Sequence, residues 1–268
     1  MNIALLRTML KFNLRSMLSY GFGMAFYLWL ITWMYPSIGQ SPSLNALLKT
    51  MPPALLKFVG YQAGISHVSD FLAGEFYGVI YVVILAIYTV MTATKLVAHL
   101  VENGSMAYLL ATPVSRVKVA VTQSVVLALG IGVIGLFSTL GGILGVRLLV
   151  PTGGLDTRFF IQMNVVGALL FVVIGAYSFL FSCIARDERQ ALSMSAVVTL
   201  IFYALHTAGT ISDKFSWLNH MSVFTVFNAP DLIHGTAPFA TRVVALAVSS
   251  IVIFAIAILG FRKRQMSL

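Results

Sequence analysis

The sequence has few of the residues on which enzymes and metal proteins depend. Its 268 residues include one cysteine, Cys183, which excludes an internal disulfide and any site with several cysteine ligands. The phosphate-binding pattern GxxxxGK[ST] is absent, and so are HExxH, HxxEH and GxSxG. The histidines are scattered, and we interpret them as polar groups satisfied by their neighbours: His67, His99, His206, His220 and His234. We therefore expect no metal, no cofactor bound by this chain and no hydrolysis of ATP by this chain alone.

Charged residues are also scarce. They make up 9% of the chain, against about 25% in a typical soluble domain, while 59% of the residues are hydrophobic. This composition is typical of an integral membrane protein. A helix needs about 20 apolar residues to cross a bilayer. The sequence predicts an all-α, single transmembrane domain over residues 1–268 with six transmembrane helices, at about residues 17–35, 76–98, 120–150, 159–185, 191–210 and 242–261.

The first sixteen residues are too short and too polar to cross a membrane. Arg7, Lys11 and Arg15 recur every four residues and form one basic stripe on a helix. This pattern predicts an N-terminal interfacial helix over residues 1–16, with its basic side toward anionic lipid headgroups. The alternative is the charged start of a signal peptide, but no cleavage site of small residues follows the next apolar run. We expect an uncleaved surface helix.

Two segments between the predicted transmembrane helices mix proline, charged and apolar residues. Residues 37–75 contain three prolines and an amphipathic stretch at 44–59. Residues 212–241 combine aromatic side chains with acidic and basic ones. Neither segment is apolar enough to span a membrane, and neither has the composition of a free loop. We expect outer helices that lie on the membrane surface or re-enter it.

The distribution of charge predicts the orientation of the chain. Six transmembrane helices place both termini on one side, and that side holds eleven of the 17 Lys and Arg residues and three acidic residues. The other side holds six basic and five acidic residues, so the net charges are +8 and +1. Because cytoplasmic loops carry the excess of Lys and Arg, we expect a multi-pass protein with both termini in the cytoplasm. The basic charge then reflects topology, and we expect no nucleic-acid partner.

Polar and small residues within two of the predicted helices leave two interpretations open. Hydroxyl groups in the second helix either bond to neighbouring helices or line a polar path, and the candidates for the path are Tyr81, Tyr88, Thr89 and Thr92. In the third helix, Gly141 and Gly145 form a GxxxG pattern that lets helix backbones approach closely. The pattern indicates either packing within one chain or an interface between two copies.

A polar stretch over residues 101–119 separates the second and third predicted helices. It starts with the polar residues Glu102, Asn103 and Gly104. Three apolar residues follow, Met106, Leu109 and Leu110, and the stretch ends in the turn-forming residues Thr112 and Pro113. The apolar residues recur at helical spacing, which predicts a short surface helix at about residues 101–118. From these residues alone, an ordinary interfacial helix that contacts only lipid headgroups explains the pattern.

The same order of residues, a carboxylate, a glycine, an apolar turn and a Pro-Val-Ser-Arg exit, resembles the first cytoplasmic loop of ABC-2 type transporter permeases. The string MPPALLKFVG at residues 51–60 resembles the proline-containing segment after their first transmembrane helix. Residues 218–227 resemble the segment before their last helix, although Val223 stands where proline is common. Residues 186–190 correspond to a second cytoplasmic connection, or are a solvated loop.

This resemblance implies a permease that works with a separate ATP-binding subunit. Two copies of the chain would form a translocation path as a homodimer. Two copies of an ABC ATP-binding subunit, carrying ATP and Mg, would dock on a coupling helix at 101–118. Glu102 would offer a carboxylate to that subunit, and Asn103 and Gly104 would begin the helix. The apolar anchors would be Met106, Leu109 and Leu110, and the turn back into the membrane would be Thr112, Pro113 and Arg116.

The resemblance also implies export across the cell membrane of a bacterium, but no motif names the cargo. A path lined by Tyr and Thr fits a hydrophobic or amphipathic substrate, such as a peptide, a drug or a lipid. Two other classes remain open. An ion-coupled secondary transporter normally has ionisable residues near the middle of the membrane, and His206 is the candidate. An intramembrane enzyme would need clustered Asp, His or Ser motifs, which are missing.

Overall fold

The computed structural model describes residues 2–38, 41, 46, 50, 51, 56, 67–111, 114–150, 154–211 and 213–263. Every secondary-structure element within these ranges is helical, and six helical segments are long and apolar enough to cross a membrane. The prediction of an all-α membrane protein with six transmembrane helices is therefore confirmed. The amphipathic stretch predicted at 44–59 lies almost entirely outside the described residues.

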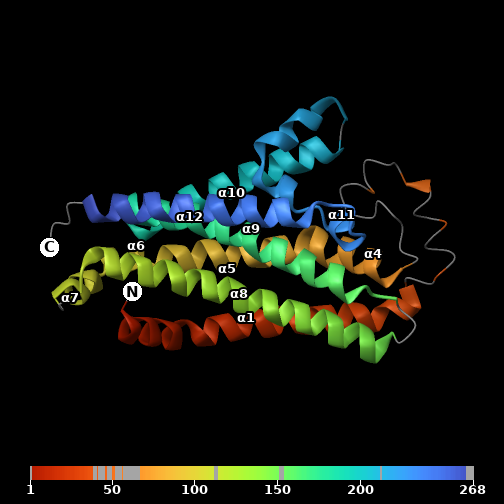
Figure 1. Cartoon of the computed structure of the whole chain (residues 1–268), viewed down its shortest axis with the longest axis horizontal. Helices are drawn as coiled ribbons and strands as arrows, with labels where there is room; N and C mark the ends of the chain where they lie inside the picture. The colour runs from red at the N-terminus through yellow and green to blue at the C-terminus, as the bar shows by residue number, and fades with distance from the viewer. Residues whose placement is uncertain are drawn as a thin grey trace.

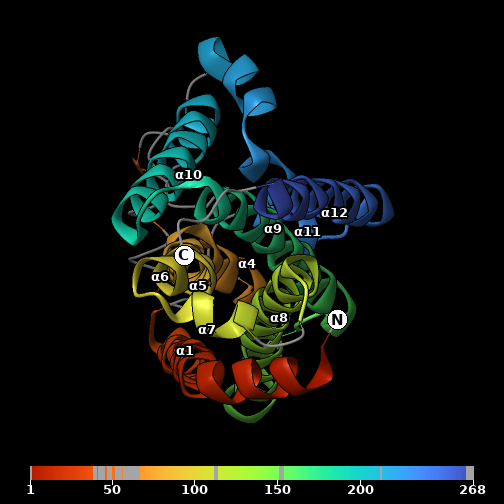
Figure 2. The same ribbon diagram turned by 90° about the vertical axis from the view of Figure 1, so that its left-hand side faces the viewer.

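The first candidate span is α1 (Ile3–Ile38), a continuous helix of 36 residues. No helix end separates the predicted interfacial helix at 1–16 from the predicted span at 17–35, because neither proline nor glycine occurs before Gly21. Figure 2 shows the first turns of α1 running across the view, at a steep angle to the rest of the helix. The three basic residues of the stripe are exposed on these turns, whereas Leu6 and Met9 pack against the core. Contact of this stripe with lipid headgroups stays a prediction.

The second candidate span begins at Val68, eight residues before the predicted start at 76. It consists of α4 (Val68–Leu72), the π-helix η1 (Ala73–Ile80), α5 (Tyr81–Leu96) and α6 (Ala98–Glu102). The prediction assigned these first turns, with Asp70, to the outer segment at residues 37–75. Asp70 is nevertheless buried, and its Oδ1 lies 2.6 Å from His234 Nε2. This pairing offsets part of the cost of burying a carboxylate.

The core of the bundle lies around α9 (Thr157–Ile184). This helix packs against α5, α8 (Arg116–Leu149), α10 (Glu188–Ile211) and α12 (Phe239–Lys263). The ends of the last four candidate spans, α8, α9, α10 and α12, differ from the predicted ends by at most four residues. On the opposite side, α1 packs along α8, as Figure 1 shows.

The GxxxG pattern of α8 makes a contact within the chain. A Cβ atom on Gly141 would lie 2.7 Å from Ala25 Cα, and one on Gly145 would lie 3.1 Å from Trp29 Cδ1. Gly141 therefore allows the backbones of α1 and α8 to approach closely. Of the two interpretations of this pattern, packing within one chain is the one that the structure supports.

The second outer segment forms three short helices, as expected: η2 (Asp213–Met221), η3 (Val223–Val226) and α11 (Ala229–Ile233). The 3-10 helix η2 packs against the end of α10, and the two project from the bundle in Figure 1. Ser222 follows η2, and its Oγ donates a hydrogen bond to Phe202 O at 2.6 Å. The chain then returns to the bundle at α11, where His234 meets Asp70.

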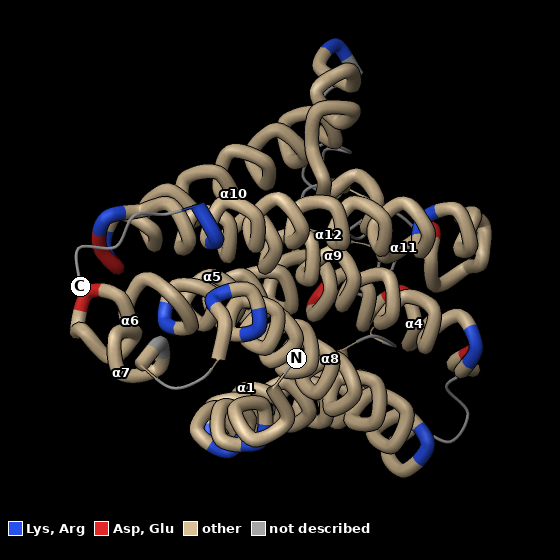
Figure 3. The backbone as a smooth tube through the Cα atoms, turned by 60° about the vertical axis from the view of Figure 1, so that its left-hand side comes forward, with Lys and Arg blue, Asp and Glu red and all other residues tan. Residues whose placement is uncertain are grey.

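The two ends of the bundle differ in charge. One end holds the start of α1, the end of α5, the start of α8, the α9–α10 turn and the end of α12. Ten of the described Lys and Arg residues lie there: Arg7, Lys11, Arg15, Lys95, Arg116, Lys118, Arg186, Arg189, Arg262 and Lys263. Figure 3 shows this clustering of basic residues. Helix α1 thus begins and α12 ends at the more basic end, and a cytoplasmic location of this end stays a prediction.

Candidate functional site

The stretch predicted as one surface helix at 101–118 is divided in the structure. After α6, residues 103 and 104 turn the chain into α7 (Ser105–Ala111) at the basic end of the bundle, and α8 begins at Arg116. Gly104 has φ +75°, in the left-handed region that favours glycine. Asn103 Oδ1 accepts a hydrogen bond from Ser105 N at 3.0 Å and so caps the start of α7.

Ser182 of α9 is inserted into the break between α5 and α6. Its Oγ accepts a hydrogen bond from Ala98 N at 2.9 Å and donates one to Thr94 O at 3.3 Å. These two backbone groups are four residues apart and would bond each other in an uninterrupted helix. A side chain inserted into this ladder is a known cause of helix kinks. One turn earlier on α9, Ser178 is equally buried, but its hydroxyl has no hydrogen-bond partner among the described residues.

The α9–α10 turn is joined to this break. Glu188 N, in the first turn of α10, donates a hydrogen bond to Glu102 Oε2 at 2.8 Å. Glu188 Oε2 in turn lies 2.6 Å from His99 Nδ1. Negative charge near a helix N-terminus is favourable, so Glu102 stabilises the start of α10. The two polar stretches that the sequence places at the cytoplasmic side therefore form one unit, which we call the basic-end junction (residues 94–111 and 182–190).

The apolar residues of α7 face the chain's own core. Met106 is 1% exposed, and Leu109 is half-buried against the core, because a spacing of three residues places both on one helical face. Met106 is therefore covered by the chain's own core in this structure, and its role as an anchor for a partner stays a prediction. Tyr108 is 82% exposed and is the aromatic side chain that α7 presents outward. The sequence analysis missed it, since a periodic pattern does not show which face meets the bundle.

The remaining residues predicted for this site have varied positions. Glu102, Asn103 and Gly104 are exposed, and Arg116 is half-buried at the first position of α8. The side chain of Leu110 is outside the described part of the structure, as are Thr112 and Pro113 altogether.

The four predicted path-lining residues are all buried within the bundle. Tyr81 stacks on Phe227 with ring centroids 5.7 Å apart, and the ring of Tyr88 meets that of Tyr20 edge-on at 5.2 Å. Tyr88 and Thr92 line a cavity between α1 and α5, whereas Tyr81 and Thr89 pack inside the core. The hydroxyls of Tyr81, Tyr88 and Thr89 have no hydrogen-bond partner among the described residues.

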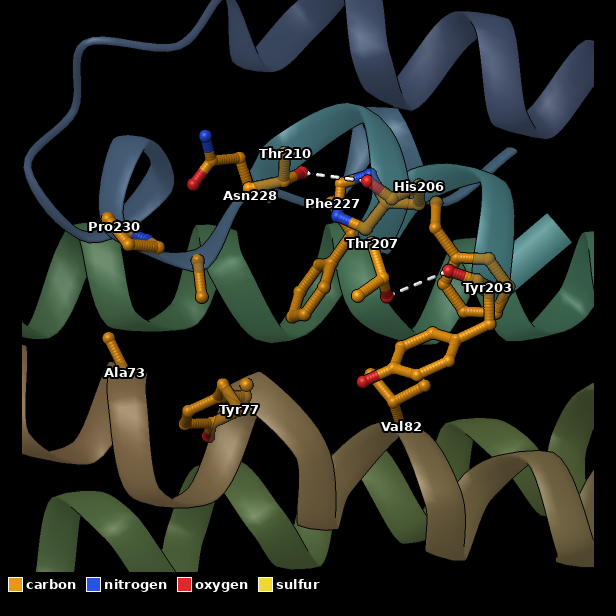
Figure 4. Close-up of a pocket in the computed structure, with 13 residues that line it drawn as sticks. Ala73, Tyr77, Val82, Tyr203, His206, Thr207, Thr210, Phe227, Asn228 and Pro230 are labelled. Atoms are coloured by element: carbon orange, nitrogen blue, oxygen red, sulfur yellow. Dashed lines mark hydrogen bonds between the residues drawn. The ribbon is translucent and has the colours of Figure 1, made fainter. Parts of the chain in front are cut away.

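A further cavity of about 100 Å³ lies toward the less basic end, between η1, α10 and the η3–α11 segment. Figure 4 shows Tyr77, Tyr203, His206 and Phe227 around it, with Asn228 above. Among the described residues that line this cavity there is no Lys, Arg, Asp or Glu. It is therefore suited to apolar and hydrogen-bonding groups rather than to ions.

Tyr77 is held rigidly beside this outer cavity. Its hydroxyl donates to Asn164 Oδ1 at 3.1 Å and lies 3.2 Å from Ser138 Oγ. Asn164 Nδ2 also donates to Phe160 O at 3.0 Å, so this buried polar cluster is well satisfied. The sequence analysis missed both the cluster and the π-helix that carries Tyr77. π-Helical turns occur frequently at functional sites, but they have no sequence pattern as clear as a helix cap.

Within the described ranges, no three His, Cys, Asp or Glu side chains gather to hold a metal ion.

Comparison with known proteins identifies the family of the chain. Residues 8–262 match the family model described as multidrug efflux system permease Rv1217c, C-terminal domain, so the match covers almost the whole six-helix bundle. No curated protein matches the chain. The chain belongs to the family of the C-terminal domain of the multidrug efflux system permease Rv1217c.

Proposed function

We propose that this chain is the membrane subunit of an ATP-driven exporter of the ABC-2 type, and that a separate ABC ATP-binding subunit docks on its basic-end junction. The family match over residues 8–262 carries this proposal. In the proposed complex, two copies of the chain form a homodimer in the cell membrane, with both termini in the cytoplasm. Each copy binds one ATP-binding subunit, which holds the ATP and Mg.

The junction is built to pass a displacement of α7 to the transmembrane helices. A push on α7 moves α6, which bonds to α10 through Glu102 and Glu188. The same movement acts on α9 through Ser182, whose hydroxyl bonds to both sides of the α5–α6 break. Closure of the ATP-binding subunits would therefore reach α5, α9 and α10 together.

The contact surface of α7 is the exposed side of the helix. Tyr108 is the aromatic anchor in this proposal, because large aromatic residues dominate the energy of many interfaces. Glu102 has an exposed carboxylate that can meet a basic group of the ATP-binding subunit while it caps α10. Leu109 and Leu110 follow Tyr108 in the sequence, and Arg116 begins the return into the membrane.

The cargo we propose is a hydrophobic or amphipathic molecule, such as a drug, a peptide or a lipid. The outer cavity supports this choice, since its described walls combine Tyr77, Tyr203 and Phe227 with hydroxyl groups and include no Lys, Arg, Asp or Glu. The description of the related permease as part of a multidrug efflux system agrees with such a cargo. The helices α1, α10 and α12 expose most of their apolar surface and offer faces for a second copy.

The test is co-purification of the tagged chain from its native host in mild detergent. We expect an ATP-binding subunit at about one per permease and ATP hydrolysis that vanadate inhibits. Tyr108→Asp should remove the ATP-binding subunit while the permease stays folded. Trp217→Asp is the matched control, because Trp217 is an exposed aromatic residue of η2 at the other end of the bundle.

Two results would contradict parts of the proposal. A wild-type chain that purifies alone, without hydrolysis, would exclude the ATP-driven exporter. Normal recovery of the ATP-binding subunit with Tyr108→Asp would exclude α7 as the docking site, although the chain would still have an ATP-binding partner.

The alternative function is ion-coupled transport, and His206 is the observation in its favour. His206 lines the outer cavity, and its Nδ1 has no hydrogen-bond partner among the described residues. Substrate transport by the purified chain in vesicles, driven by a proton gradient without ATP, would establish this alternative. Loss of that transport in His206→Gln would assign the coupling to this residue.

A further inference from the structure

A second cavity, of about 350 Å³, lies between the first turns of α1 and the last turns of α5. Its described walls come from these two helices, with Phe12, Asn13, Arg15, Ser16, Ser19 and Tyr20 on α1 and Tyr88, Met91, Thr92 and Lys95 on α5. The space is open because α1 packs mainly along α8 and makes few contacts with α5. Its volume falls within the range of pockets that hold small molecules, roughly 300–1,000 Å³.

The described residues give this cavity an excess of positive charge. Arg15 and Lys95 lie on its two walls, and no acidic residue is among the described residues that line it. Neither cation forms an ion pair with any carboxylate in the part of the chain that the structure describes. Two unpaired cations facing one cavity favour an anionic ligand.

The other walls divide into a polar and an apolar part. Ser16, Ser19 and Thr92 offer hydroxyl groups that can donate hydrogen bonds to phosphate oxygens. Phe12 is 84% exposed and Met91 is 37% exposed, so the cavity has an apolar border. A free anion would use the cations and hydroxyls but gain nothing from this border. An amphiphile with an anionic head uses both.

We propose that this cavity binds the phosphate headgroup of an anionic phospholipid, with Arg15 and Lys95 against the phosphate and the acyl chains along Phe12 and Met91. The cavity lies at the more basic end of the bundle, so the lipid comes from the leaflet at that end. This inference goes beyond the proposed function, because the lipid is a component of the folded permease rather than its cargo. It bridges α1 and α5, which otherwise scarcely touch.

The test measures lipid binding to the purified full-length chain in detergent by native mass spectrometry. The probes are phosphatidylglycerol and phosphatidylcholine with identical acyl chains. We expect wild-type protein to bind phosphatidylglycerol about tenfold more tightly, since two cations meet its net charge. Arg15→Gln with Lys95→Gln should lose this preference. Lys118→Gln with Arg189→Gln removes the same charge from exposed sites at the same end and should keep it.

Three outcomes would overturn the proposal. Equal binding of the two lipids by wild-type protein would exclude selection of an anionic headgroup. An unchanged preference in the Arg15→Gln, Lys95→Gln variant would exclude this cavity. Competition by millimolar inorganic phosphate, with no effect of acyl-chain length, would replace the lipid by a soluble anion.

A conservative variant guards against misfolding as an explanation. Arg15→Lys with Lys95→Arg keeps both charges and should keep the preference for phosphatidylglycerol. Loss of the preference in this variant, with helical circular dichroism unchanged, would show that charge at these two positions is not the cause and would contradict the proposal.

Discussion

Replacing Ser182 by alanine should destabilise the permease and weaken the link between its basic end and the bundle. The substitution removes one hydroxyl and leaves Ala98 N and Thr94 O without the partner that joins them. Leaving a buried polar group unsatisfied costs about 1–3 kcal/mol. Partial reclosure of the break, with Ala98 N bonding directly to Thr94 O, would recover some of this energy. We therefore expect a loss of about 1–2 kcal/mol in the free energy of unfolding.

Ser178→Ala is the matched control for this prediction. Ser178 lies one turn away on the same helix and is as fully buried as Ser182, but its hydroxyl has no hydrogen-bond partner among the described residues. The assay is reversible unfolding of both variants in mixed micelles with increasing denaturing detergent. Ser178→Ala should be neutral or slightly stabilising. Equal stabilities of the two variants would refute the reasoning, because the only difference between them is the pair of hydrogen bonds.

Three further substitutions test other features of the fold. Gly141→Leu should separate α1 from α8 and lower the free energy of unfolding by about 1–3 kcal/mol in the same assay. Gly132→Leu should be tolerated, because a Cβ atom at this position meets nothing within 4 Å. Gly104→Val should lower the free energy of unfolding by about 1–2 kcal/mol, because the φ of Gly104 is positive. Recovery of the ATP-binding subunit should also fall, since the turn leads into α7. An unchanged free energy of unfolding would contradict this prediction. Tyr177→Phe removes a 2.7 Å hydrogen bond to a threonine of α10 and should cost about 0.6 kcal/mol, while Tyr81→Phe, which loses an unpartnered hydroxyl, should not.

The transmembrane helices could be predicted because apolar length is a property of the sequence alone. The second candidate span begins eight residues earlier than predicted, and it includes Asp70, a charged residue that is buried beside a partner. That partner, His234, lies 164 residues away, and no local pattern connects the two. A charged residue within an apolar run is therefore a weak boundary signal when its partner is distant.

The candidate site was predicted only in part. The polar stretch at 101–119 does form a helical turn at the basic end of the bundle, with Gly104 in the conformation that its position requires. The direction of α7 was not predictable, since Met106 and Leu109 give the same periodicity whether they face a partner or the chain's own core. Ser182 gave no signal, because an isolated serine in an apolar helix is indistinguishable from one that has no partner.

The π-helix η1 connects the outer pair of Asp70 and His234 to α5. A π-helical turn holds one residue more than an α-helical turn, so a return of Ala73–Ile80 to α-helical bonding would rotate α4 by about 100° and shift it by about 1.5 Å relative to α5. We hypothesise that transport uses this change, and cysteines replacing Asp70 and His234 would test it through oxidation, since the native Cys183 is buried. Transport that persists after cross-linking would reject the hypothesis. The π-helical turns thus set the register of α4 on α5, and the pair of Asp70 and His234 is formed in that register.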